Sequence, residues 1–388
     1  MYGSGRIESI SCPLIRPFPF VRYLLLTLCL GAFCIHSRAQ VLTDAGAQQT
    51  IQKALDDIYN LEFADADAQI RQIRARYPQH PIGPILLATK LELQYLPIHE
   101  NKAATAQFTQ AVGQGLELAK RMLDKNEDDP EGVFFALTAH SYMASFYNNQ
   151  SESLKAVGES KRSYSYLKDG FKLMDRNPDF YFTTGLYNYY VERYPLDHPV
   201  VRPFMFFFAD GDMAQGLKQM DVAARRGVFM RVGANYYLAH ILIKHEMQPA
   251  RASQYTKYLA DKYPNNPLFG MINAEALLLA GRYVEARPYV GRLRTMPNTL
   301  VPLAVATFEG MLAEQADKND KEAAEHYQAA LKLPYNDPYT REYRAMAYAG
   351  LARLAARAGD STRAKDYYKK ALAIGQYKAL IREAKAYK

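Results

Sequence analysis

The feature that most constrains the fold of this chain is a recurrence in its alanines. Ala252, Ala286, Ala323 and Ala364 each lie in a similar amphipathic segment, and they are 34, 37 and 41 residues apart. Within each segment the other apolar residues follow at three-and-four spacing, which is the period of a helix. A recurrence of this length indicates a repeated helical pair, in which each pair covers the apolar face of its neighbour.

The most regular unit lies near the C-terminus. Gly359-Asp360-Ser361 provides a turn, and Ala364, Tyr368 and Ala371 follow on a second helix. Small residues let two helices approach closely, while large residues fill the space between them. This pattern resembles the tetratricopeptide repeat, and the resemblance covers roughly residues 48 to 374. It implies an all-α fold, a right-handed solenoid of antiparallel helix pairs.

We predict three parts along the chain. Residues 1–39 are expected to be a signal peptide, residues 40–376 a repeat domain of about seven helix pairs, and residues 377–388 a capping helix. Residues 195–210 are expected to interrupt the domain as an inserted loop, because Pro195, Pro199 and Pro203 fall four residues apart.

The first 39 residues have the pattern of an export signal. Arg16 and Arg22 precede an apolar run from Tyr23 to Ile35, and Ser37-Arg38-Ala39 supplies the small residues that a signal peptidase requires. The run is shorter than the roughly 20 residues needed to span a bilayer. We therefore predict cleavage after Ala39 and a bacterial protein of the periplasm or cell envelope; the alternative is that this segment stays as a membrane anchor.

Charge and cysteine content exclude several classes of function. All three cysteines lie in the leader, so the mature chain would have no disulfide and no cysteine-ligated metal. The net charge of +8 falls to about +5 without the leader, and the basic residues are spread along the chain. A nucleic-acid partner would require them to gather on one face, so we predict no nucleic-acid binding.

No enzyme motif is recognisable in the sequence. It contains no HExxH, no Gly-rich phosphate loop and no GxSxG, and its histidines are scattered over different segments. We predict no catalytic residue, no metal site and no cofactor. The least favoured alternative is an unrecognised enzyme site at Glu192, His198 and Asp210.

The resemblance implies a concave groove lined mainly by the first helix of each pair. It would place Tyr237, Lys244 and His245 there in one unit, and Arg353 and Arg357 in the last unit. Lysine and arginine on such a surface could hold the terminal carboxylate or an acidic side chain of a peptide. The alternative for these residues is a solvated helix face, which is the commoner case.

Two aromatic segments are further candidates. Tyr189 and Tyr190 lie in a cluster within a chain of 30 tyrosines, and aromatic side chains suit a binding surface, although core packing is the favoured alternative. The run 204–208 contains Phe206 and Phe207, and five consecutive large apolar residues cannot all be solvated. We expect this run to plug the superhelix; a docking patch for a partner or a membrane is the alternative.

These observations together predict an exported, non-catalytic scaffold for a protein or peptide partner, because stacked repeats present a long curved surface. Peripheral association with a membrane or an outer-membrane complex stays open. The alternative function is glycan or nutrient binding in an outer-membrane uptake system, since tyrosine rings suit sugar stacking. Such proteins usually carry a lipid anchor, whereas Phe33 precedes Cys34 where a lipoprotein would have a small residue.

Overall fold

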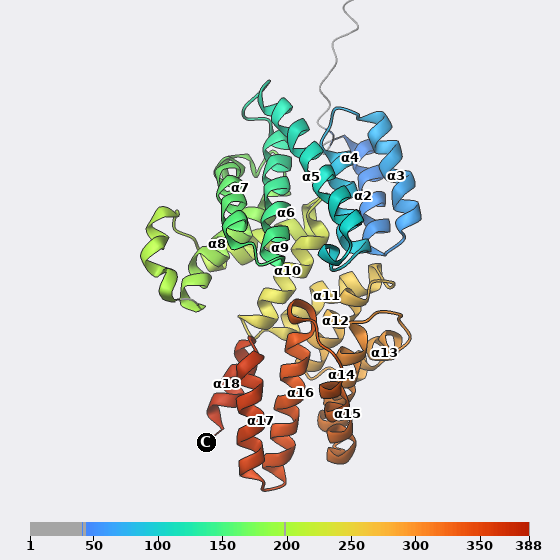
Figure 1. Ribbon diagram of the computed structural model, residues 1–388, viewed down its shortest axis with the longest axis vertical. Coiled ribbons are helices and arrows are strands. Elements are labelled where there is room, and N and C mark those ends of the chain that lie inside the picture. Colours follow the sequence, from blue (N-terminus) through green and yellow to red (C-terminus); the bar gives the residue numbers. More distant parts are fainter. Residues whose placement is uncertain (1–40, 42–43, 198, 388) are drawn as a thin grey trace, which may run out of the picture.

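The computed structural model describes residues 41, 44–197 and 199–387. The predicted leader at residues 1–39 lies outside the described residues. Throughout the described part every regular element is a helix and no strand occurs. The helices follow one another as stacked hairpins from one end of the molecule to the other (Figure 1). The prediction of an all-α solenoid of helix pairs is confirmed.

The described helices form eight antiparallel pairs and a single last helix, rather than about seven pairs. Between residues 100 and 178 the helices are longer than most others of the chain, with 22, 20 and 21 residues. The last helix, α18 (Lys378–Ala386), packs on α17 and α16. The pairs are α2 (Ala45–Tyr59) with α3 (Phe63–Arg76), α4 (Ile82–Gln94) with α5 (Lys102–Leu123), α6 (Pro130–Asn149) with α7 (Ser153–Leu173), α8 (Phe180–Asp197) with α9 (Met213–Arg226), α10 (Arg231–Lys244) with α11 (Pro249–Lys262), α12 (Pro267–Leu279) with α13 (Tyr283–Leu293), α14 (Val301–Gln315) with α15 (Asp320–Lys332), and α16 (Asp337–Arg357) with α17 (Ser361–Ile374).

Six of the eight pairs turn through a residue in the left-handed backbone region. Gly281 and Gly359 occupy this position with φ of 73° and 79°, where the absence of a Cβ removes the steric cost. The same position is taken by residues other than glycine in the remaining four turns, namely Leu61, Ser151, Met247 and Lys318. The two pairs without this turn are those interrupted by short 3-10 helices, η1 (Ile98–Glu100) and η2 (Pro199–Phe207).

The expected loop at residues 195–210 is largely helical. The helix α8 continues through Pro195 to Asp197, and η2 follows from Pro199 to Phe207. Pro195 lies in the last turn of α8, so its missing N–H interrupts the helix only at the end. The Nε of Arg202 donates to the carbonyl oxygen of Pro195 at 3.2 Å. The segment projects from the body as a separate lobe (Figure 1).

Small residues permit close packing between pairs. The four recurrent alanines are fully buried on the second helices, and the ring of Tyr327 packs between Gly310 of α14 and Gly350 of α16. A Cβ atom at position 350 would lie 2.3 Å from the nearest carbon of that ring. These contacts explain why the last pairs need glycine in the middle of two helices.

Replacing Gly350 by alanine is therefore expected to lower the free energy of unfolding by about 1–3 kcal/mol, as overpacking of a core does. Gly291→Ala in α13 is the matched control, because a Cβ there would meet nothing within 4 Å. The control should be neutral or gain up to about 1 kcal/mol from helix propensity. Urea unfolding followed by circular dichroism compares the two, and equal stability of both variants would contradict the packing argument.

Candidate functional site

A cavity of about 690 Å³, which we call the central cavity, opens on the inner side of the superhelix. First helices of the pairs supply most of its wall, from α2, α4, α6, α8, α10, α12 and α16, and α7 adds a further part. The lining is mainly aliphatic and aromatic. Its tyrosines are Tyr59, Tyr142, Tyr164, Tyr187, Tyr190, Tyr236, Tyr237 and Tyr339.

The superhelix closes on itself beside this cavity. The first pair meets the segment between α11 and α12, about 200 residues later in the chain: the hydroxyl of Tyr263 donates to Asp56 at 2.7 Å, and the Nδ2 of Asn266 donates to the carbonyl of Tyr59 at 2.9 Å. Lys262 also forms an ion pair with Asp56, at 2.8 Å. These contacts fix the wall of the cavity where the first and sixth pairs meet.

A row of aromatic rings forms that wall. Phe182 lies 5.6 Å from Tyr237, which lies 5.7 Å from Tyr236, measured between ring centroids. Phe269 continues the row at 6.2 Å from Tyr236 and 6.1 Å from Tyr59. Ring pairs at these separations attract one another beyond the burial of their area. The row therefore joins α8, α10, α12 and α2 into one surface.

The end of the η2 segment forms another part of the wall. The ring of Phe208 packs edge-on against Tyr164 at 5.4 Å, and the hydroxyl of Tyr187 donates to the carbonyl of Ala209 at 2.7 Å. Phe206 is 76% exposed, so the expectation of a plug is wrong for this residue. Its segment continues from α8 as a projecting lobe (Figure 1). The side chain of Phe207 lies outside the described residues.

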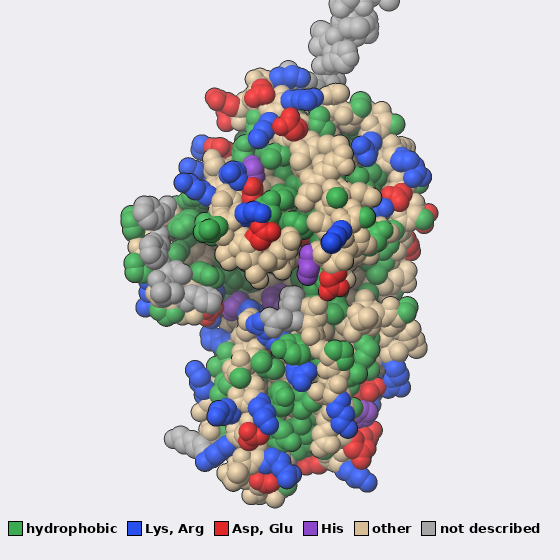
Figure 2. Space-filling model, in the orientation of Figure 1, with side chains coloured by type: hydrophobic (Ala, Val, Ile, Leu, Met, Phe, Trp, Pro, Cys, Tyr) green, Lys and Arg blue, Asp and Glu red, His purple; other side chains and the backbone are tan. Residues whose placement is uncertain are grey.

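The lobe also presents other large apolar side chains to solvent, including Leu196 at 54% exposure. Hydrophobic side chains gather on the lobe, and the surface beside it is hollowed (Figure 2). Apolar patches of this kind are a common feature of interaction sites. None of the described helices has the length and apolarity to cross a bilayer.

Glu92 of α4 is the one charged residue among those that line the central cavity in the described part of the chain. Its side chain is partly exposed because it faces the cavity. Burial raises its pKa to about 7, because the surrounding apolar wall solvates the ionised carboxylate poorly. Nothing in the sequence pointed to Glu92, since a single glutamate on an apolar helix carries no motif.

Two of the predicted binding residues do line the central cavity. Tyr190 and Tyr237 both contribute to its wall, and Tyr237 is 45% exposed. Burial, reinforced by the charge of Glu92, raises the pKa of the Tyr237 hydroxyl. This hydroxyl therefore stays protonated at neutral pH and can donate a hydrogen bond.

Tyr189 and His245 are not available to a partner, contrary to the prediction. Tyr189 is fully buried, and its hydroxyl donates to Glu246 at 2.5 Å. His245 is buried against Tyr190, with ring centroids 6.1 Å apart, and burial lowers its pKa to about 4, so that it stays neutral. Both lie on the side of their helix that faces the core, which periodicity alone does not distinguish from the groove side.

Lys244 lies in a second hollow of about 280 Å³, which we call the side pocket. The side pocket shares Tyr236, Leu268 and Tyr339 with the central cavity. The Nζ of Lys244 donates to Gln376 at 2.7 Å. Burial lowers the pKa of Lys244, and the nearby charge of Glu342 offsets part of this effect. The side pocket thus contains its own cation.

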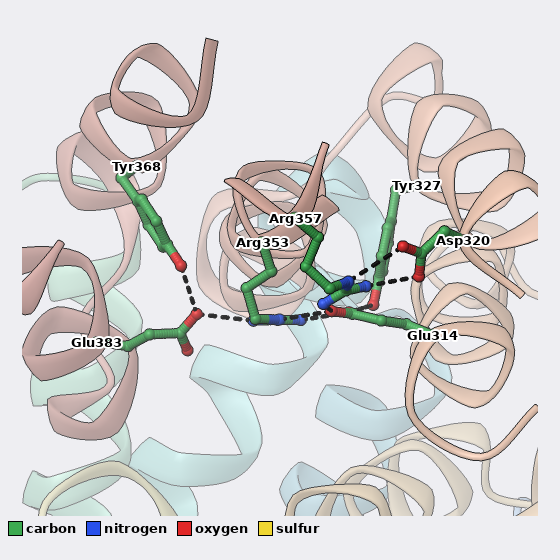
Figure 3. Close-up of polar contacts among 7 residues, drawn as sticks. All are labelled: Glu314, Asp320, Tyr327, Arg353, Arg357, Tyr368 and Glu383. Atoms are coloured by element: carbon green, nitrogen blue, oxygen red, sulfur yellow. Dashed lines mark hydrogen bonds and ion pairs between the residues drawn. The ribbon is translucent and has the colours of Figure 1, made fainter. Parts of the chain in front are cut away.

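Arg353 and Arg357 are held by carboxylates of this chain. Both project from α16 toward α14, where Glu314 accepts hydrogen bonds from Arg353 Nε at 2.8 Å and Arg357 Nη1 at 3.0 Å (Figure 3). Arg353 also bonds Glu383, and Arg357 bonds Asp320. This geometry does not support the prediction that they contact a partner. Their guanidinium N–H groups already bond carboxylates of neighbouring helices in this chain.

The least favoured enzyme site gains no support from the placement of its residues. His198 lies outside the described residues, and no group of His, Cys, Asp and Glu within the described part of the chain could hold a metal ion. The arrangement of the central cavity suits binding, because its wall is a fixed aromatic surface with one carboxylate.

Comparisons with known proteins add little to this description. No family model and no curated protein matches the chain. Among solved structures, yeast Tom70 is similar at 14% identity, covering 94% of this chain and 78% of that one, with a TM-score of 0.36. A tetratricopeptide repeat protein from Parabacteroides merdae is similar at 14% identity, covering 77% of this chain and 97% of that one, with a TM-score of 0.31. The solenoid fold is established by the chain's own helix pairs.

Proposed function

We propose that this protein is an exported, non-catalytic scaffold of the bacterial cell envelope that binds a protein or peptide partner in its central cavity. The observation that carries the proposal is the cavity itself. Its volume of about 690 Å³ falls within the range of roughly 300–1,000 Å³ typical of ligand sites. First helices from most of the pairs contribute to one continuous wall, so a bound segment would contact many repeats at once.

The chemistry of the wall supports an extended apolar segment as the guest. Tyrosine and phenylalanine supply large contact areas with few rotatable bonds, so that little side-chain entropy is lost on binding. The ring row from Phe182 to Tyr59 is already packed in place before a guest arrives. Preorganisation of this kind increases affinity, because side chains that are already packed lose less conformational entropy when the guest binds.

A glycan or nutrient ligand of an outer-membrane uptake system is the second candidate. The eight cavity tyrosines favour it, because their rings and hydroxyls could stack on and hydrogen-bond to sugars. The location in the envelope is proposed for both candidates on the basis of the leader, with Ala39 as the last residue removed.

The test is photocrosslinking in native cells from a reactive amino acid placed at Ser145, an exposed residue of the cavity wall. We expect one dominant protein adduct in the envelope fraction, attached to a chain whose N-terminus is Gln40. The matched control carries the same group at Val284 of α13, which is 83% exposed and outside the cavity. Equal adducts at both positions, or a glycan recovered in place of a protein, would count against a protein scaffold.

A further inference from the structure

Glu92 differs from the buried carboxylates of Asp179 and Glu314 in having no donor in the described part of the chain. Asp179 accepts three backbone N–H groups, and Glu314 accepts two guanidinium groups and the hydroxyl of Tyr327. No hydrogen bond or ion pair links Glu92 to another residue of the described chain, and burial alone accounts for its raised pKa. An ionised carboxylate in such a place is costly unless a cation joins it.

No positively charged side chain among the described residues forms an ion pair with this carboxylate. The residues that line the central cavity include no lysine, arginine or histidine in the described part of the chain. In the side pocket, by contrast, the carboxylate of Glu342 has Lys244 nearby. The negative charge of the central cavity is therefore the uncompensated one, and its complement is a positive charge on the guest.

The rings around Glu92 suit a cation as well. Tyr59, Tyr237 and Tyr339 line the same cavity as Glu92. Burial raises the pKa of each hydroxyl, and the charge of Glu92 raises it further. These hydroxyls have no hydrogen-bond partner among the described residues. Tyrosine faces attract ammonium and guanidinium groups, and several rings around one position form the aromatic cages that recognise such groups.

We infer that the central cavity receives a lysine or arginine side chain from an otherwise apolar peptide segment of the partner, with the charged end at Glu92. This inference rests on the proposed function and specifies the chemistry of the guest. Because the cavity has a single carboxylate, we expect one basic residue in the bound segment. Because the wall is aliphatic and aromatic, we expect apolar residues on either side of that basic residue.

The dimensions favour a peptide segment over a free amine. At about 690 Å³ the central cavity is far larger than one side chain requires, and it continues through Tyr236, Leu268 and Tyr339 into the side pocket. A small amine would leave most of this wall uncovered. An extended segment would cover it and place one cation at Glu92.

The experiment is calorimetric titration of the mature protein with capped pentapeptides of sequence alanine–leucine–X–leucine–alanine, where X is lysine, norleucine or glutamate. We expect the lysine peptide to bind at least about tenfold more tightly than the norleucine peptide at about pH 8, since it adds a charge-assisted hydrogen bond and a cation–π contact. Glu92→Gln should reduce this preference to near unity. Glu100→Gln, a nearby exposed carboxylate outside the cavity, should leave it unchanged.

Lowering the pH provides an independent readout. The lysine preference should weaken from about pH 8 to about pH 6, because Glu92, with its pKa of about 7, takes up a proton in this range. The titratable groups nearest to it are Tyr59, Tyr142, Tyr237 and Tyr339, whose pKa values all lie above the ordinary value and which stay neutral throughout. The Glu92→Gln variant should show no such dependence.

The outcomes separate the two proposals. If the norleucine or glutamate peptide binds as tightly as the lysine peptide, or if Glu92→Gln keeps the full preference, the inference is wrong while the scaffold proposal stands. If n-butylammonium alone matches the lysine peptide, the guest is a small amine and the peptide assignment is overturned. If no peptide binds and no adduct forms from position 145, the proposed function fails and the inference with it. Thermal unfolding of Glu92→Gln confirms that any loss of binding is not a loss of fold.

Discussion

Replacing Glu314 by alanine is expected to lower the free energy of unfolding by about 3–5 kcal/mol, which is typical of removing one partner from a buried ion pair. The side chain of Glu314 is fully buried and accepts hydrogen bonds from Arg353, Arg357 and the hydroxyl of Tyr327 (Figure 3). Arg353 is only 26% exposed, so its guanidinium would lose its main partner with little access to water. Urea unfolding followed by circular dichroism measures the change.

Asp320→Ala is the matched control, because Asp320 bonds the same Arg357 from the surface. Its side chain is 51% exposed, and exposed ion pairs contribute only about 0–1 kcal/mol. If Glu314→Ala and Asp320→Ala had equal effects, the network would not stabilise the last pairs through burial. The comparison therefore tests the position of the carboxylate and not its charge alone.

The Glu314 effect should depend on acidity in a defined direction. Burial opposes ionisation, but the hydrogen bonds from Arg353, Tyr327 and Arg357 outweigh it and hold the pKa of Glu314 below its ordinary value of 4.5. A carboxylate with a lowered folded-state pKa contributes its full stability above the unfolded pKa and loses it as the pH falls through the folded one. The difference between wild type and Glu314→Ala should therefore persist at neutral pH and shrink below about pH 4.5.

Asp179→Ala is expected to cost about 3–5 kcal/mol as well, because it leaves several buried donors without an acceptor. Asp179 is 1% exposed, and its carboxylate accepts from the backbone N–H groups of Val228, Phe229 and Met230 at 2.9, 3.2 and 2.8 Å. These bonds attach the start of α8 to the turn between α9 and α10. Losing them should loosen the fourth pair from the fifth, which hydrogen exchange of the three amides would detect.

The control for this variant is Asp175→Ala, a nearby carboxylate that accepts a solvent-exposed hydrogen bond from the hydroxyl of Tyr181 at 3.3 Å. It should change stability by less than about 1 kcal/mol. Asp179→Asn should fall between the two, because its amide keeps one acceptor oxygen but points an NH₂ group at the remaining donors. If Asp179→Ala proved as mild as Asp175→Ala, the three bonds would not hold the pairs together.

Helix pairing was predictable because its signals are local. Ala286 and Ala364 recur at helical spacing within their segments, and Gly281 and Gly359 mark the turns with the residue that the left-handed conformation favours. The count of pairs was less accurate, because the same turn is made elsewhere by Leu61 or by other residues that carry no turn signal.

The candidate site was only partly predictable. Tyr190 was predicted from aromatic content and Tyr237 from the groove that the repeat resemblance implies, and both line the cavity. Tyr189, the neighbour of Tyr190, lies in the core. Adjacent helical residues point about 100° apart, and the sequence does not fix which of the two directions faces the groove. Arg353 was expected to be free for a partner, but its partner is Glu314, 39 residues earlier.

The sequence by itself determined the class of the fold, because apolar periodicity and turn residues act within a few positions of one another. Only the tertiary structure decided where the cavity lies and which charge in it is unmatched. Closure of the superhelix brings Asp56 to Tyr263. Glu314 and Asp179 have donors, whereas Glu92 has none among the described residues and shares the cavity with rings from α2, α10 and α16. Whether a charge has a partner depends on side chains far away in sequence, and stacking of the pairs is what brings them together or keeps them apart.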